Sequence, residues 1–248
     1  MLSTRELERY ARQVMLFGEE GQERLKASTI FIAGAGGLGS PVSIYLAVAG
    51  VGTLILVDND IVDRTNLNRQ ILHFERDIGK RKTASAGEKL QALNPDIEVK
   101  VIDATIDTGS IDRLIDNADG IVDALDNFPT RYLLNEKAVA VNIPFFHGAI
   151  RGFCGQVTTI LPGKTACLRC IFPDPPPGEV SPVVGTTPGL IGMVQATEVL
   201  KYVVGSGELL ANRLFLWDGM RACVDEIALE KDPSCNVCGE IGNREMVK

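Results

Sequence analysis

The stretch that decides the fold is Thr29-Ile30-Phe31-Ile32-Ala33-Gly34-Ala35-Gly36-Gly37-Leu38-Gly39, an apolar run that ends abruptly in glycines. The β-branched and aromatic residues of 29–33 favour a buried strand. A run of small residues with a helical pattern follows over 40–49, and a second apolar run lies at 53–57. Two strands joined by a helix run parallel with a right-handed crossover, so the sequence predicts a Rossmann-like α/β fold.

The same alternation continues along the chain. Helices are predicted at 80–93, 110–116, 128–141 and 189–204, and strands at 97–101, 120–123, 144–147, 157–161, 213–217 and 222–229. Before the first strand, residues 3–17 have the spacing of an amphipathic helix, and Ser3 with Glu6 forms a capping-box pattern. We therefore expect a mostly parallel sheet with flanking helices.

After Gly155 the pattern becomes irregular, with short extra strands and a proline-rich stretch, Pro173 to Pro188, in which Pro175-Pro176-Pro177 is predicted as a surface loop. We expect one domain over residues 1–248. Its predicted parts are an N-terminal helix (3–17), a nucleotide-binding core (28–150) and a C-terminal part held by a metal (155–240).

Composition excludes several classes of protein. With 25 basic and 32 acidic side chains the net charge is −7, which argues against general nucleic-acid binding. No apolar run approaches the ~20 residues of a membrane span. The N-terminus is charged from Arg5 onward, unlike a signal peptide, and six cysteines in 248 residues are too few for a secreted disulfide scaffold. We expect a cytoplasmic protein.

The glycine-rich segment is a candidate nucleotide site. Gly34, Gly36 and Gly39 fit the G-x-G-x-x-G pattern, with Gly37 as an additional small residue, between a predicted strand and a predicted helix. The helix N-terminus would offer N–H groups to a phosphate. Asp58 ends the next strand, where a carboxylate can accept hydrogen bonds from ribose. The motif does not separate ATP from NAD, so an NAD-linked oxidoreductase stays an alternative.

Further polar residues favour a nucleoside triphosphate. Asn66 and Arg69 are three residues apart, so one helical turn would bring both to the same place. The cations of 80–82, Lys82 among them, lie at a helix start, where they oppose the helix dipole unless they meet an anion. Asp126 follows a predicted strand end and is a natural ligand for Mg²⁺ beside phosphates. It could instead cap the following helix.

Four of the six cysteines form two Cys-x-x-Cys pairs, Cys167/Cys170 and Cys235/Cys238. Four thiolates are the ligand set of a structural Zn²⁺ site, which would fix the C-terminal tail to the preceding loop. A redox dithiol and four unrelated thiols are the alternatives.

The remaining cysteines and both histidines are expected to be structural. Cys154 and Cys223 are single and flanked by ordinary strand residues, so we expect small buried thiols. His73 and His147 have no acid or thiol partner that the sequence reveals, and we expect neither to be catalytic.

With these motifs in place, the sequence resembles the MoeB/ThiF/HesA family, the prokaryotic relatives of ubiquitin-activating enzymes. The resemblance extends from about Glu8 to Gly239. It rests on RYARQ (9–13), GAGGLGSP (34–41), AGVGTLILVDNDIVDRTNLNRQILH (49–73), IGKRK (78–82), LNPDI (93–97), DALDN (123–127), GQVT (155–158), CLRC (167–170), GMVQATEVLK (192–201) and CNVCG (235–239).

The resemblance implies an ATP-dependent adenylyltransferase. It would activate the C-terminal Gly-Gly carboxylate of a ubiquitin-like sulfur carrier, of the MoaD or ThiS kind, as an acyl-adenylate with release of pyrophosphate. The resemblance implies that Asp58 holds the ribose and that Asp126 places Mg²⁺. It assigns phosphate binding to Asn66, Arg69 and Lys82.

The resemblance also implies partners. Arg12 would reach the triphosphate of a partner subunit, which implies a homodimer with shared sites. Zinc would hold the four paired cysteines. Because no rhodanese domain follows Lys248, we expect the sulfur donor to be a separate protein.

The chain departs from the family pattern in one loop. Many relatives have a cysteine before the helix that ends in QATE, and alignment back from Gln195 places Gly178 there. A thioester or persulfide step on this loop is therefore not expected. A displaced nucleophile, Cys154 or Cys223, stays an alternative without support.

Two functions besides carrier adenylation and NAD chemistry are compatible with these motifs. One is a non-catalytic, zinc-stapled scaffold that binds a carrier. The second is adenylation of a different acceptor, such as a peptide or a tRNA base, and the acidic net charge disfavours tRNA.

Overall fold

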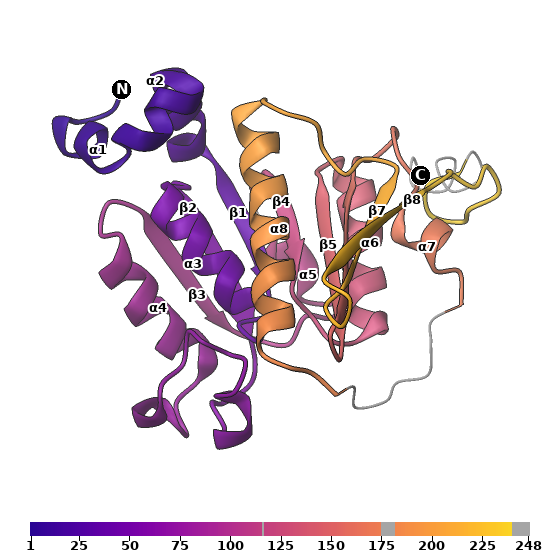
Figure 1. Cartoon of the computed structure of the whole chain (residues 1–248), viewed down its shortest axis with the longest axis horizontal. Helices are drawn as coiled ribbons and strands as arrows, with labels where there is room; N and C mark the ends of the chain where they lie inside the picture. The colour runs from indigo at the N-terminus through magenta and orange to yellow at the C-terminus, as the bar shows by residue number, and fades with distance from the viewer. Residues whose placement is uncertain (116, 175–181, 240–248) are drawn as a thin grey trace.

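A computed structural model describes residues 1–115, 117–174 and 182–239. Its centre is one eight-stranded sheet with the order β3-β2-β1-β4-β5-β6-β7-β8 (Figure 1). The strands are β1 (Thr29–Ala33), β2 (Thr53–Asp58), β3 (Glu98–Asp103), β4 (Gly120–Asp123), β5 (Phe145–Arg151), β6 (Cys154–Ile160), β7 (Arg213–Asp218) and β8 (Cys223–Ala228). This is the predicted α/β class.

The sheet has a parallel half and an antiparallel half. β3, β2, β1, β4 and β5 pair in parallel, as strands joined by helices do. From β5 onward the pairing is antiparallel, because β6 returns from β5 through a short turn. The carboxyl ends of β1, β2 and β4 therefore meet at one edge, where ligands of open α/β sheets bind.

Helices cover both faces of the sheet. They are α1 (Thr4–Arg9), α2 (Ala11–Ala27), α3 (Gly39–Ala49), α4 (Lys82–Leu93), α5 (Ile111–Leu114), α6 (Phe128–Val141), α7 (Leu168–Ile171) and α8 (Thr186–Val204). Single 3₁₀ turns lie at η1 (Arg64–Asn66) and η2 (Glu75–Asp77). Within the described residues, none of these helices has the length and apolar character needed to cross a bilayer.

Alternate residues of β1 enter two separate cores. Ile30 and Ile32 pack with α3, α4 and α8, whereas Phe31 and Ala33 pack with α5, α6 and α7. All four of these side chains are fully buried. A strand buried on both faces has a continuous apolar run, which is why residues 29–33 predict it so clearly.

The N-terminal prediction was wrong in one respect. The Ser3–Glu6 capping box is present, but the helix predicted over 3–17 is two helices, and the second continues to Ala27. The break is at Tyr10, whose buried hydroxyl accepts a hydrogen bond from Asn94 Nδ2 at 2.8 Å. Gly18, with φ 72°, adds a kink. Tertiary contacts at Tyr10 override the helical pattern of the sequence.

Candidate active site and metal centre

Two glycines shape the turn between β1 and α3. Gly34 has φ 103°, in the region that side chains rarely adopt. A Cβ atom on Gly39 would lie 1.9 Å from the carbonyl oxygen of Gly34. Both positions therefore require glycine, as the motif predicts.

The same loop presents free backbone donors. Among the described residues, the amides of Gly36 and Gly37 donate no hydrogen bond. A Cβ atom on Gly36 would meet only the side chain of Gln70, at 3.6 Å, so the backbone is open on that side. Free N–H groups before the N-terminus of α3 make an anion-binding site.

Asp58 connects the end of β2 to the glycine loop. Its Oδ2 accepts a hydrogen bond from the amide of Ala35, and its Oδ1 accepts one from the amide of Asp60, both at 2.8 Å. A carboxylate oxygen can accept two hydrogen bonds, so each keeps one lone pair for a ribose hydroxyl.

The segment after η1 places Arg69 beside the glycine loop. Arg69 Cγ lies 3.7 Å from the position of a Cβ atom on Gly37. Its Nη1 donates to the carbonyl of Thr65 at 2.9 Å and to Asn68 Oδ1 at 3.0 Å. Asn66 completes a capping box at η1, and its Oδ1 accepts from the Asp63 amide at 3.1 Å.

The three cations at the start of α4 have separate partners. Lys80 pairs with Asp77 and Arg81 with Asp103, so these two cations have carboxylate partners of their own. Lys82 is 5% exposed. Its Nζ lies 2.8 Å from Asp60 Oδ2, and the Asp60 amide is bonded to Asp58. Lys82 is thereby held at the same edge of the sheet as Asp58.

Asp126 is exposed, just beyond the carboxyl end of β4. Asn127, not Asp126, caps α6, because its side chain accepts from the amide of Thr130 at 3.0 Å. In the part of the chain that the structure describes, the Asp126 carboxylate has no hydrogen bond or ion pair. The preceding Ala124 carbonyl lies 2.8 Å from the position of a Cβ atom on Gly34, so this loop borders the glycine loop.

Arg12 lies away from these residues. It is an exposed residue of α2, and its neighbour Gln13 donates to the carbonyl of Ala49 at the C-terminal end of α3, at 2.9 Å. The glycine loop is at the other end of α3, about 16 Å away at 1.5 Å per residue. Figure 1 shows α2 at the end of the sheet where β1 begins. Arg12 is therefore no part of its own chain's nucleotide site.

Sequence reasoning missed two features of this edge. Gln70 is buried beside Gly36, and its Oε1 has no hydrogen-bond partner among the described residues. His147, expected to have no acidic partner, lies with its Nδ1 2.7 Å from Asp123 Oδ2. The two residues are register partners on the adjacent parallel strands β4 and β5, so only the strand pairing reveals the contact. Arg131 Nε is 3.3 Å from the same oxygen.

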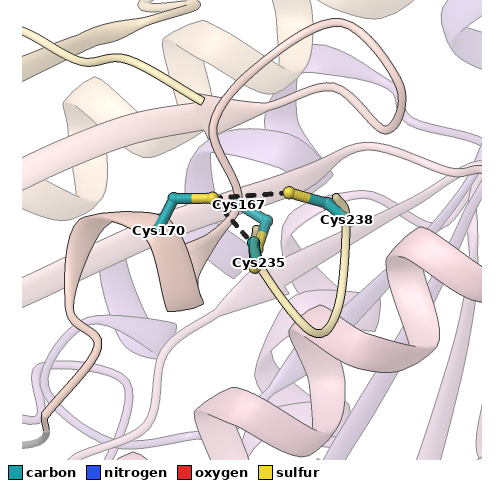
Figure 2. Close-up of side chains that lie close together, drawn as sticks. All are labelled: Cys167, Cys170, Cys235 and Cys238. Carbon is teal, nitrogen blue, oxygen red and sulfur yellow. Dashed lines mark hydrogen bonds between the residues drawn. The ribbon is translucent and has the colours of Figure 1, made fainter. Parts of the chain in front are cut away.

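The four paired cysteines come together as predicted. Their sulfur atoms all lie within 4.8 Å of one another (Figure 2). The Sγ–Sγ distances are 3.9 Å for Cys167–Cys170, 3.7 Å for Cys167–Cys235 and 3.4 Å for Cys170–Cys238. Four thiolates at about 2.3 Å from one tetrahedral Zn²⁺ lie about 3.8 Å apart, so the spacing fits a metal.

The cluster joins the C-terminal tail to α7. Cys167 is the N-cap of α7, and Cys235 lies in a turn closed by the hydrogen bond from the Gly239 amide to the Cys235 carbonyl. Burial raises the pKa of Cys167 to about 11. A cation among the sulfurs would oppose this shift and favour the thiolate form.

The two single cysteines were predicted to be buried, and this was wrong for both. Cys154 is exposed and Cys223 is only partly buried. Cys154 begins β6 and Cys223 begins β8, and each is a register partner of Asp218 at the end of β7. The next residue of β6, Gly155, is buried against Ile191 of α8, whereas Cys154 is exposed. Gly178 and the proline run of 175–177 lie outside the described residues.

Fold and site together define a Rossmann-like nucleotide-binding protein with a four-cysteine cluster that suits a metal. Residues 10–237 match the ThiF family, and the chain belongs to that family.

Two curated relatives are similar over nearly the whole chain. The SAMP-activating enzyme E1 of Haloferax volcanii is 43% identical, over 97% of this chain and 92% of its own length. The sulfur carrier protein adenylyltransferase of Thermus thermophilus is 42% identical, over 98% of this chain and 94% of its own length.

Solved structures agree on the fold. MccB of E. coli with ATP superposes with a TM-score of 0.82 and 27% identity, over 93% of this chain and 74% of that one. MccB with MccA-N7isoASN gives a TM-score of 0.84 and 25% identity, over 94% of this chain and 75% of that one.

Proposed function

We propose that this protein is an ATP-dependent adenylyltransferase that activates the C-terminal Gly-Gly carboxylate of a ubiquitin-like sulfur carrier. The observation that carries the proposal is the convergence at one sheet edge of free glycine-loop amides, a buried lysine and an exposed carboxylate. The family membership and the names of the two curated relatives, a SAMP-activating enzyme and a sulfur carrier protein adenylyltransferase, support it.

The proposed reaction joins two anions. A carboxylate oxygen of the carrier attacks the α-phosphorus of ATP, the bond from that phosphorus to the β-phosphate bridging oxygen breaks, and pyrophosphate leaves. The attacking carboxylate is already ionised at neutral pH, so no general base is required. The work of the protein is to neutralise charge and to align the two groups.

Each site residue has a proposed part in that work. The amides of the glycine loop, with Asn66, Arg69 and Lys82, bind the phosphates, and Asp58 accepts hydrogen bonds from the ribose. Asp126 would hold Mg²⁺, which neutralises phosphate charge when bound. Because residues 172–189 contain no cysteine, we propose that the acyl-adenylate is released without a thioester step.

The proposal can be tested by its intermediate. Incubation with ATP, Mg²⁺ and a Gly-Gly-ending carrier is expected to give a carrier that is heavier by one adenylyl group (AMP less one water) in mass spectrometry. Binding of NAD in place of ATP would instead support the oxidoreductase. Binding of the carrier with ATP present but without adenylate formation would support the scaffold.

Asp126→Asn is expected to lower the rate of carrier-dependent ATP–pyrophosphate exchange by about tenfold or more. It should also raise the Mg²⁺ concentration that gives the half-maximal rate, because one of few metal ligands loses its charge. The matched control is Asp225→Asn, an exposed acid on the edge strand β8, which should leave the Mg²⁺ requirement unchanged. Exchange is measured over a Mg²⁺ titration. An unchanged Mg²⁺ requirement in the Asp126→Asn protein would contradict the assignment.

We also propose that the protein is a homodimer in which Arg12 completes the partner's site. Arg12 is exposed and about one length of α3 from its own glycine loop, so it can serve a triphosphate only in another chain. Helices α2, α3 and α8 are packed together and carry exposed apolar side chains. These are Met15, Leu16, Tyr45, Val48, Met193 and Tyr202. Such a surface suits a second copy.

Mixing two inactive variants tests the shared site. Arg12→Ala and Arg69→Ala are each expected to be nearly inactive alone. In a mixed dimer one site carries both defects and the other carries neither, so mixing and exchange of subunits should restore part of the wild-type rate. No recovery in a mixture shown to contain mixed dimers would place Arg12 outside the site.

For the cysteine cluster we propose Zn²⁺, because four sulfur ligands in tetrahedral spacing select it over Mg²⁺. Thiols kept free for a metal suit a reducing compartment, and we propose the cytoplasm. The proposal includes a separate protein as the sulfur donor.

A further inference from the structure

A buried polar chain behind the glycine loop is not used by the proposed reaction. It contains His73, Ser85, Lys89 and Asp77. The side chains of His73, Ser85 and Asp77 are 3%, 0% and 1% exposed. Burial of so many polar groups is costly unless each is satisfied, so their arrangement needs a reason.

The contacts fix the direction of every hydrogen bond in the chain. His73 Nε2 lies 2.9 Å from the carbonyl oxygen of Ala35, which can only accept, so Nε2 carries the proton. In the neutral ring Nδ1 then accepts, and Ser85 Oγ, at 2.9 Å, donates to it. Burial, with the nearby Lys89 and Lys82, lowers the pKa of His73 and keeps the ring neutral.

Lys89 supplies the start of the chain. Its Nζ lies 2.7 Å from Ser85 Oγ, 3.0 Å from the Ser85 carbonyl and 2.5 Å from Asp77 Oδ2, which uses all three of its donors. The Asp77 carboxylate also accepts from the amide of Phe74 at 2.9 Å and from Lys80 at 3.2 Å. The donors therefore run in one direction, from Lys89 through Ser85 and His73 to Ala35.

The chain ends on the peptide that faces the phosphate site. Ala35 is held on both sides, since its amide is bonded to Asp58 and its carbonyl to His73. In a trans peptide the carbonyl of Ala35 and the amide of Gly36 point in opposite directions. Fixing the carbonyl toward His73 therefore aims the free Gly36 amide at the open side of the loop.

We infer that His73 is a positioning residue for nucleotide binding: as the Nε2–H tautomer, it anchors the Ala35 carbonyl and so aims the Gly36 amide at the nucleotide phosphates. This role rests on the proposed function, because it requires a nucleotide at the glycine loop. It contrasts with the purely structural role that the sequence predicts for His73.

ATP binding, measured by calorimetry with ATP–Mg²⁺ and no carrier, tests the role. His73→Phe fills the space but cannot donate, and its Kd for ATP is expected to rise about tenfold, the size of one lost hydrogen bond. His73→Gln places an amide donor near the same point and is expected to stay within about threefold of wild type. Equal Kd values for wild type and the folded Phe variant would overturn the inference.

Serine variants supply a matched control. Ser85→Ala removes the donor to Nδ1 and is expected to raise the Kd for ATP. Ser28→Ala removes a similarly buried hydroxyl at the opposite edge of the sheet, where its one hydrogen bond among the described residues is to the Leu25 carbonyl. It is expected to leave the Kd unchanged. Equal Kd values in these two proteins would contradict a role for the buried polar chain in positioning the Gly36 amide.

The tautomer can be read in the wild-type protein, so the test does not depend on how variants fold. The protein has two histidines, His73 and His147, and His147 donates from Nδ1 to Asp123. Long-range ¹H–¹⁵N spectra should therefore show one Nε2–H and one Nδ1–H ring, assigned with the His73→Gln protein. A charged or Nδ1–H ring at His73 would overturn the inference. Wild type that binds ATP but activates no carrier would defeat the proposed function alone, and wild type that does not bind ATP would defeat both.

Discussion

Arg69→Ala is expected to lower carrier-dependent ATP–pyrophosphate exchange by about 10²–10³-fold, the usual cost of one preorganised donor to developing charge. The arginine lies beside Gly37 and uses Nη1 to hold its own loop, and within the described residues its other N–H groups have no partner and can meet a phosphate. Initial exchange rates at saturating carrier measure the loss.

The neighbouring Arg64→Ala is the control for this substitution. Arg64 is on the same segment, but its side chain is 76% exposed and pairs with Glu75 at 2.8 Å. Because exposed ion pairs contribute little to stability, the ATP–pyrophosphate exchange rate of the Arg64→Ala protein should equal that of wild type. Near-normal exchange in the Arg69→Ala protein, or equal losses in both, would remove Arg69 from the phosphate site.

Cys235→Ala is expected to lower the affinity for zinc by well over ~100-fold. Loss of a residue that only supports a metal ligand costs up to ~100-fold, and this substitution removes a ligand itself. Wild type purified without chelator should contain about one zinc per chain, and the variant should contain almost none. The tail should then detach from α7, which lowers the Tm. Elemental analysis and thermal unfolding measure the two effects.

Cys154→Ala is the matched control for the metal site. Cys154 is exposed, and its sulfur is not among the four that cluster. It should keep its zinc and its Tm. Wild-type protein without stoichiometric metal would contradict the zinc assignment, and so would zinc retained in the Cys235→Ala protein.

The parts of the fold that sequence predicts best are those fixed by local patterns. The apolar run at 29–33 and the glycines after it determine β1 and the turn, because only glycine is tolerated at Gly34 and Gly39. The helix predicted at 128–141 is present with those bounds. The two Cys-x-x-Cys pairs predict that their four sulfur atoms lie close together, since a tetrahedral metal site needs four ligands.

Features that depend on contacts between distant segments could not be predicted. The break at Tyr10 depends on Asn94, and the acid beside His147 becomes visible only through the register of β4 with β5. The resemblance places Arg12 in the site of a partner subunit; the fold puts it at the far end of α3 from its own glycine loop, and its place in a partner's site stays a prediction. The exposure of Cys154 likewise depends on tertiary packing, since the next residue of β6, Gly155, is buried against Ile191 of α8.

The most direct test of carrier adenylation is ATP–pyrophosphate exchange with each Gly-Gly-ending carrier from the same cell, beside a matched carrier whose C-terminal carboxylate is amidated. The proposed function predicts rapid exchange with at least one intact carrier and none with its amidated form, because the carboxylate is the nucleophile. No exchange with any intact carrier, or equal exchange with the amidated form, would contradict it.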